Sequence, residues 1–104
     1  MANEQMVQET TKKENTNEVF IGNKPFMKYV IATLMQLDEN PTAVIKARGK
    51  FISRGVDVAE VARKKLRETK DIELRNSVRI GTERFQNEEG KDINVSIIEI
   101  ELTK

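Results

Sequence analysis

The spacing of apolar residues changes along this chain and predicts where its helices and strands lie. Residues 18–22 form a short apolar run closed by glycine, which is typical of a buried strand. In residues 25–39 apolar positions recur every three or four residues, which predicts a helix packed on more than one side. Residues 42–49 alternate as a second strand does, and a second helical pattern runs from Ser53, the predicted N-cap, to Thr69.

After Lys70 the apolar spacing changes to every second residue, which predicts two long strands. They cover residues 72–85 and 93–102, and Gly90 supplies the positive φ that the hairpin turn between them requires. Strands usually have about 5–6 residues, so we expect this hairpin to project from the body as an arm. Near Ile97 the apolar residues change from odd-numbered to even-numbered positions, a parity shift that indicates either a bulge or the change from exposed arm to packed body.

The predicted order is β-α-β-α-β-β, which favours an α+β fold built as a two-layer sandwich. A parallel, right-handed crossover joins the first two strands most simply. The expected result is a four-stranded mixed sheet with two helices on one face and a long C-terminal β-hairpin arm. We predict one domain over residues 18–104, preceded by a disordered tail over residues 1–17, which are polar and poor in large apolar groups.

The composition excludes several classes of function. The 104 residues include no cysteine and no histidine, which rules out the usual zinc sites and the Ser-His-Asp and Cys-His nucleophile systems. The glycine-containing segments lack the full phosphate-loop pattern, and no apolar segment approaches the ~20 residues of a membrane span. We therefore expect a non-enzymatic protein without a cofactor or metal, in the reducing cytoplasm and away from membranes.

The charge is nearly balanced overall but unevenly distributed. The formal net charge is +1, yet residues 23–54 hold six lysines and arginines against two acidic residues. A local basic segment on a neutral chain indicates a polyanionic partner more strongly than the total charge does.

The predicted topology brings two basic loops together. Lys24 follows the first strand, and Lys50 and Arg54 follow the second, and parallel strands of a β-α-β unit end on the same side of a sheet. Helix N-termini at these loops add partial positive charge, and Lys46 and Arg48 share one face of the second strand. This placement predicts a phosphate-binding surface, and a merely solvated basic face is the alternative.

The aromatic residues bear on which polyanion is bound. Phe20, Phe26 and Tyr29 fall in apolar patterns that predict burial. Phe85 on the arm is a candidate for exposure, and Phe51 is either exposed or, by a small preference, caps the core beside the basic loop. Proteins that bind single strands usually present several stacking rings. We therefore expect a duplex bound mainly through its phosphates, with weak sequence readout.

Three segments resemble the Alba family of archaeal chromatin proteins. They are VFIGNKPFMKYVIATLMQL, VIKARGKFISRGVDVAEVARKKL and the closing VSIIEIEL, which carry the motifs IG-x-KP and I-KARG-x-x-IS-x-x-VD. The resemblance implies a fold like the C-terminal domain of bacterial translation initiation factor three. It also implies a chromosome-associated homodimer that binds double-stranded DNA, and often RNA, with little sequence preference, and that coats or bridges DNA.

The resemblance also implies roles for single residues. Lys24 matches the loop lysine of IG-x-KP, Arg48 matches the arginine of KARG, and Lys50 stands where arginine is common. Arg54 lies in the IS-x-x-VD segment. Asn23 replaces a lysine that many family members carry, which leaves Lys24 as the candidate for acetylation, a change that would remove its charge.

Two further positions depart from the family pattern. The hairpin tip is acidic where many family arms are basic, although Arg84 on the arm strand is a further candidate contact. Leu66 stands where some relatives carry a phenylalanine that contacts the next dimer on DNA, so we expect weaker contacts between dimers.

Two alternatives to a DNA-binding chromatin protein remain open. The protein could act mainly on RNA, in its protection or maturation, because duplex DNA and RNA both present phosphates. It could instead be a protein-interaction subunit with weak nucleic-acid affinity, which the acidic hairpin tip and the low net charge favour.

Overall fold

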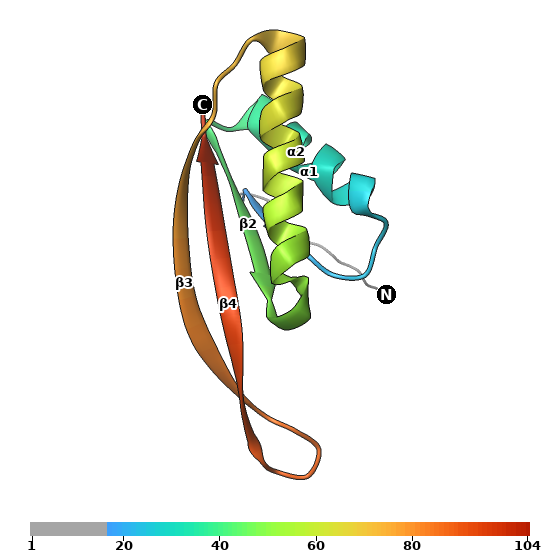
Figure 1. The fold of residues 1–104 in the computed structure, drawn as a ribbon, viewed down its shortest axis with the longest axis vertical. Coiled ribbons are helices and arrows are strands. Elements are labelled where there is room, and N and C mark those ends of the chain that lie inside the picture. The colour runs from blue at the N-terminus through green and yellow to red at the C-terminus, as the bar shows by residue number, and fades with distance from the viewer. Residues whose placement is uncertain (1–16) are drawn as a thin grey trace.

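The computed structural model describes residues 17–104, and its elements follow the predicted order (Figure 1). They are β1 (Glu18–Phe20), α1 (Phe26–Glu39), β2 (Thr42–Arg48), the 3-10 turn η1 (Gly49–Phe51), α2 (Ile52–Lys70), β3 (Arg75–Gln86) and β4 (Asp92–Thr103). The sheet has the order β1-β2-β4-β3, with β1 parallel to β2 and the other pairs antiparallel. This confirms the two-layer α+β fold, with both helices on one face of a mixed sheet.

The helix α1 packs on one side only, which corrects the predicted packing on several sides. Val30 and Leu37 are buried against the sheet. Met27, Ile31 and Met35 are 44%, 52% and 58% exposed, because α2 and the sheet cover only one face of the helix. No helix within residues 17–104 is long and apolar enough to cross a membrane.

The start of α2 differs from the prediction. Ser53 is not the N-cap, because helical hydrogen bonding begins earlier, in η1. Gly49 adopts a φ of +58°, and its carbonyl accepts a hydrogen bond from the Ile52 N–H at the junction of η1 and α2. A side chain other than glycine would be strained at this φ. The glycine thus turns the chain sharply from β2 into α2.

The helix α2 lies very close to β2. Gly55 is buried, and a Cβ atom at this position would stand only 3.0 Å from the Cβ of Ala47. The close approach brings the N-terminal end of α2 onto the sheet and completes the core, in which Ile45 and Val58 are fully buried.

The hairpin of β3 and β4 is continuous and has no bulge. Its register runs without interruption from the Arg75–Thr103 pair to the Gln86–Asp92 pair. The parity shift near Ile97 therefore reflects the change from exposed arm to packed body, which is the second of the two interpretations. The arm projects beyond β2 and gives the molecule its longest dimension, 50 Å (Figure 1).

The hairpin turn is held by one asparagine. The Asn87 Oδ1 atom accepts hydrogen bonds from the N–H groups of Glu89 and Lys91, each at 2.9 Å. Gly90 has a φ of +83°, as the sequence predicted.

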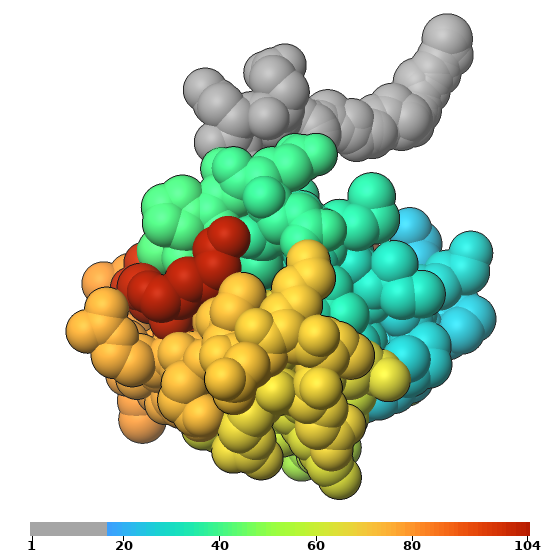
Figure 2. All heavy atoms as spheres, turned by 90° about the horizontal axis from the view of Figure 1, so that it is seen from above, coloured from blue at the N-terminus to red at the C-terminus, as the bar shows by residue number. Residues whose placement is uncertain are grey.

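The two ends of the molecule are different in character. Figure 2 looks at the end opposite the hairpin tip, where the last residues of β4, the segment after α2 and the segment after α1 meet. There, Lys104 N–H donates to the Pro41 carbonyl at 3.0 Å, and Lys70 Nζ lies 3.1 Å from Asp38 Oδ1. The loops after β1 and β2 lie at the other end, from which the arm projects (Figure 1).

The predicted N-terminal tail lies outside the described residues, apart from Asn17. The Asn17 side-chain amide donates to the Thr42 carbonyl at 3.2 Å and also to the Thr42 hydroxyl. Its own carbonyl accepts a hydrogen bond from the Val44 N–H at 2.9 Å. Asn17 is therefore attached to β2.

Candidate nucleic-acid interface

The two basic loops are neighbours, as the topology predicted. Arg54 on the first turn of α2 donates from Nη2 to the Lys24 carbonyl at 2.6 Å. Its guanidinium carbon also lies 5.8 Å from the centroid of the Tyr29 ring. Arg54 thus fixes the loop after β1 against the start of α2, in addition to contributing charge.

The hydroxyl of Tyr29 organises the same loop. It accepts hydrogen bonds from the N–H groups of Gly22 and Lys24, both at 2.9 Å. Tyr29 is only 7% exposed, so its ring is part of the core while its oxygen reaches the loop. Sequence reasoning missed this role, although a hydroxyl within an apolar helical stripe, five residues after Lys24, was a usable signal.

The exposed cations of the site lie beside helix N-termini that have no caps. Lys24, Lys50 and Asn23 are exposed, and within residues 17–104 neither lysine forms an ion pair. None of α1, η1 and α2 has a side-chain cap or an acidic residue in its first turn. The first N–H groups of a helix have no partner within the helix, and an anion can supply one. Two of these groups are already bonded here, Lys28 N–H to the Pro25 carbonyl and Ile52 N–H to the Gly49 carbonyl. The two exposed lysines at this end are chemically suited to an anion such as phosphate.

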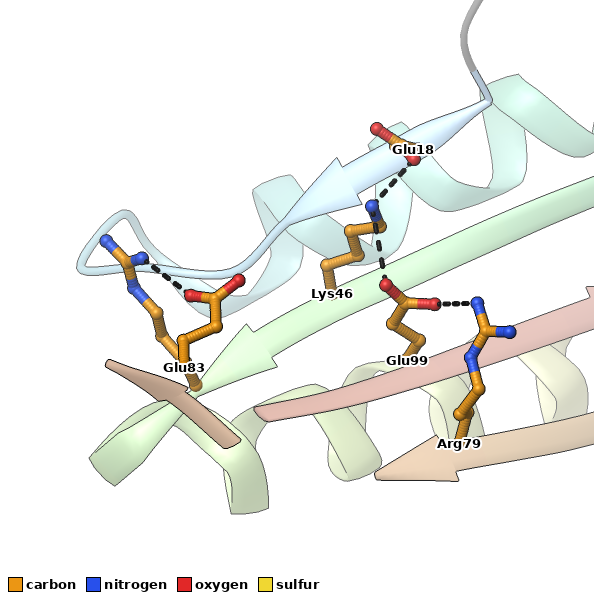
Figure 3. Close-up of polar contacts among 6 residues, drawn as sticks. Glu18, Lys46, Arg79, Glu83 and Glu99 are labelled. Atoms are coloured by element: carbon orange, nitrogen blue, oxygen red, sulfur yellow. Dashed lines mark hydrogen bonds and ion pairs between the residues drawn. The ribbon is translucent and has the colours of Figure 1, made fainter. Parts of the chain in front are cut away.

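Arg48 connects the body with the arm. It is exposed at the end of β2, where its Nη1 lies 3.4 Å from Glu83 Oε1, and its guanidinium carbon lies 4.8 Å from the Phe85 ring centroid. Figure 3 shows Glu83 reaching toward this guanidinium. The sequence did not indicate the contact, because β4 must first be placed between β2 and β3.

Lys46 does not join the loop cluster, which is the group of residues at the two basic loops: Asn23, Lys24, Lys50 and Arg54. It lies on the face of the sheet away from the helices, with Nζ 2.8 Å from Glu18 Oε2 and 3.5 Å from Glu99 Oε2 (Figure 3). Glu99 Oε1 in turn lies 2.7 Å from Arg79 Nη2, so one chain of ion pairs crosses all four strands. The bond with Glu18 raises the pKa of Lys46, and the bond from Arg79 lowers the pKa of Glu99.

Arg84 lies on the exposed arm, beside an acidic residue. Its Nη1 is 3.8 Å from Asp92 Oδ2, and 72% of its side chain is accessible. The positive charge of Arg84 on the arm is therefore partly compensated by Asp92.

Phe20 was predicted to be buried, and this was wrong. It is 66% exposed, whereas Val19 and Ile21 are buried. The apolar run in residues 18–22 hid the alternation of β1, which directs Phe20 to the face of the sheet away from the helices. Phe85, at 37%, is also exposed, as expected, and Phe51 is half-buried.

Comparisons with known proteins agree on one family. The sequence profile of the Alba family matches residues 17–77. The chain is 49% identical to "DNA/RNA-binding protein Alba 1" of Archaeoglobus fulgidus over 89 residues, which are 85% of this chain and 96% of that protein. It is 47% identical to "DNA/RNA-binding protein Alba" of Methanocella arvoryzae, over 85% of this chain and 90% of that protein.

Solved structures give the same result. The chain superposes on Alba from Thermoplasma volcanium with a TM-score of 0.73 and 43% identity, over 85% of this chain and all of the other. With ALBA1 from Trypanosoma brucei the TM-score is 0.58 at 25% identity, over 88% of this chain and 72% of the other.

Proposed function

The chain belongs to the Alba family, and on this premise we propose that it binds DNA and RNA without sequence specificity. Two of its relatives are named DNA/RNA-binding proteins. The observation that carries the proposal is the loop cluster, in which Lys24 and Lys50 flank uncapped helix N-termini and Arg54 joins the two loops at 2.6 Å.

In this proposal the loop cluster binds the phosphate backbone of a duplex. Lys24 and Lys50 contact phosphate oxygens, the first N–H groups of the helices donate to them, and the Asn23 amide adds a neutral donor. Arg48 contributes from the end of β2 when it exchanges Glu83 for a phosphate. Contacts of this kind fix the position of the protein on the duplex but do not read its sequence.

The proposed ligand is double-stranded DNA, which the protein coats or bridges as a chromosome-associated protein, and duplex RNA binds through the same contacts. Arg84 on the arm supplies a further contact along the duplex. Leu66 is 5% exposed and belongs to the core, which supports the expectation of weak contacts between dimers.

We also propose that the chain forms a homodimer. Val78 and Ile80 on β3 are 54% and 77% exposed, on the same face of the sheet as α2, where Val56 is 39% exposed. Exposed apolar groups of this size indicate a protein contact, and a second copy places both loop clusters on one ligand. Ile80→Asp should convert the dimer to a monomer in analytical ultracentrifugation.

Lys24 is the proposed site of acetylation. Its side chain is exposed, and acetylation would remove one of the two lysine charges that face the ligand. Lys24→Gln, which imitates this loss of charge, should weaken binding, whereas Lys24→Arg should preserve it.

The function is tested by titrating the protein into two unrelated random-sequence DNA duplexes and their RNA counterparts at one physiological salt concentration. The proposal expects similar affinities for the two sequences, with Kd values of about 10⁻⁴–10⁻⁶ M or lower. Absence of binding to all four duplexes would contradict the proposal and would favour the alternative of a protein-interaction subunit.

A further inference from the structure

The face of the sheet away from the helices contains a cavity beside the base of the arm. Its volume is about 360 Å³, at the small end of the range for pockets that hold small ligands. Its walls include Phe20 from β1, Lys46 and Arg48 from β2, Glu83 from β3, and Ile97 and Glu99 from β4. The cavity is distinct from the loop cluster, although Arg48 lies next to both.

An aromatic ring forms one wall of this cavity. Phe20 is 66% exposed, which is unusual for a phenylalanine at the edge of a well-packed sheet. Lys46 Nζ lies 5.7 Å from the centroid of the ring, so the ring stands beside a cation. Exposed rings of this kind in nucleic-acid-binding proteins are platforms on which unpaired bases stack.

The charges of the cavity are balanced. Lys46 is paired with Glu18 and Glu99, and Arg48 is paired with Glu83. A face without excess positive charge has little attraction for the phosphate backbone of a duplex. A neutral nucleobase suits it better, because a base has one apolar face for the ring and polar edges for the ammonium and carboxylate groups.

We propose that this cavity binds an unpaired nucleobase of a single-stranded nucleic acid, stacked on Phe20. Arg48 lies at the end of β2, immediately before the turn η1 that carries Lys50. A strand whose phosphates lie on the loop cluster can therefore place one base in the cavity. The inference rests on the proposed nucleic-acid binding and extends it from duplexes to single strands.

The test compares fluorescence anisotropy of labelled oligouridylate, oligothymidylate and a random duplex bound to the wild type and to Phe20→Ala. Removing the ring should weaken single-strand binding about 5- to 150-fold, the effect of one stacked base. Duplex binding should not change, because Phe20 itself is not among the proposed phosphate contacts. Equal losses for both oligonucleotides support recognition of the base alone, and a loss confined to oligouridylate assigns the site to RNA.

Two further variants separate stacking from the removal of apolar surface. Phe20→Leu keeps an apolar side chain but should lose single-strand affinity as Phe20→Ala does. Phe20→Tyr keeps an aromatic ring and should retain the wild-type affinity. Met35→Ala removes a similarly exposed apolar side chain from α1, on the helix side of the molecule, and should have no effect. In the wild type, ultraviolet crosslinking of a thiouridine oligonucleotide should label the peptide that contains Phe20.

The inference is overturned if Phe20→Ala binds single strands as tightly as the wild type, or if the crosslink lies elsewhere. It is also overturned if Phe20→Ala changes the oligomeric state of the protein in solution, because the ring would then belong to a contact between copies. A wild type that binds the duplex but no single strand defeats this inference alone. A wild type that binds neither defeats the proposed function as well.

Discussion

The loop cluster and the open face of the sheet, which is the face away from the helices, both contain cations from residues 45–55, but in different surroundings. Lys50 belongs to the loop cluster, where within residues 17–104 it forms no ion pair. Lys46, four residues earlier, is held between Glu18 and Glu99 on the open face. Position in the topology, rather than the local density of cations, therefore determines which of these lysines is held in an ion pair.

The largest expected effect removes both lysines of the loop cluster. Lys24→Gln/Lys50→Gln should weaken duplex binding about a hundredfold, since each charge-assisted hydrogen bond contributes roughly 1.5 kcal/mol. Lys46→Gln/Lys64→Gln removes the same charge from the open face and from the exposed side of α2, and should leave the affinity nearly unchanged. Electrophoretic mobility shifts at one salt concentration measure both, and equal losses would erase the distinction between the regions.

The second prediction concerns the loop that holds Lys24. Tyr29→Phe removes the oxygen that accepts hydrogen bonds from the N–H groups of Gly22 and Lys24. The free energy of unfolding should fall by about 1–3 kcal/mol, because partly buried donors lose their acceptor. Urea denaturation measures the change, and the duplex affinity should fall with it. A variant as stable as the wild type would mean that the hydroxyl does not organise the loop.

The third prediction concerns Arg48, which is paired with Glu83 on the arm. Glu83→Gln releases Arg48 from its ion pair on the arm, so duplex affinity should rise by roughly 1.4- to 5-fold, the range for an exposed pair. Isothermal titration calorimetry at low salt would detect this change. Glu88→Gln at the hairpin tip removes the same charge without touching Arg48 and serves as the control. A loss of affinity in Glu83→Gln would indicate that Glu83 instead holds Arg48 in its binding position.

The smallest expected effect is the pH dependence of the stability that the ion pair of Arg79 and Glu99 on the open face provides. The pKa of Glu99 is lowered from its usual 4.5 by the hydrogen bond from Arg79. A carboxyl group whose pKa is lower in the folded than in the unfolded chain stabilises the fold at pH values above its unfolded pKa. This contribution disappears as the pH falls below 4.5 through the folded pKa. Thermal unfolding of the wild type and Glu99→Gln should therefore differ at neutral pH and converge in acid. A difference that persists at low pH would rule out this ion pair as its source.

Much of the fold was predictable because its signals are local. The change of apolar spacing near Lys70 separated helices from hairpin, and Gly90 marked the turn. The parallel pairing of β1 and β2 followed from the crossover rule, and it correctly placed the loops of Lys24 and Lys50 at one end of the sheet. These features need only periodicity and chain connectivity.

The rest depended on which strands are neighbours. Lys46 is neutralised by residues of β1 and β4, and Arg48 is held by β3, so neither contact exists until the order β1-β2-β4-β3 is known. Phe20 was misplaced because three consecutive apolar residues conceal which face each one takes. Ser53 was misplaced because η1 begins the helical turn before it.

The most direct test of the account is the salt dependence of duplex binding. The logarithm of the affinity is plotted against the logarithm of the salt concentration for the wild type, Lys24→Gln, Lys50→Gln and Lys46→Gln. The account predicts that the slope decreases by about one for each lost phosphate contact in the two loop variants and stays at the wild-type value in Lys46→Gln. A decrease in Lys46→Gln equal to that in the loop variants, or no decrease in any of them, would contradict it.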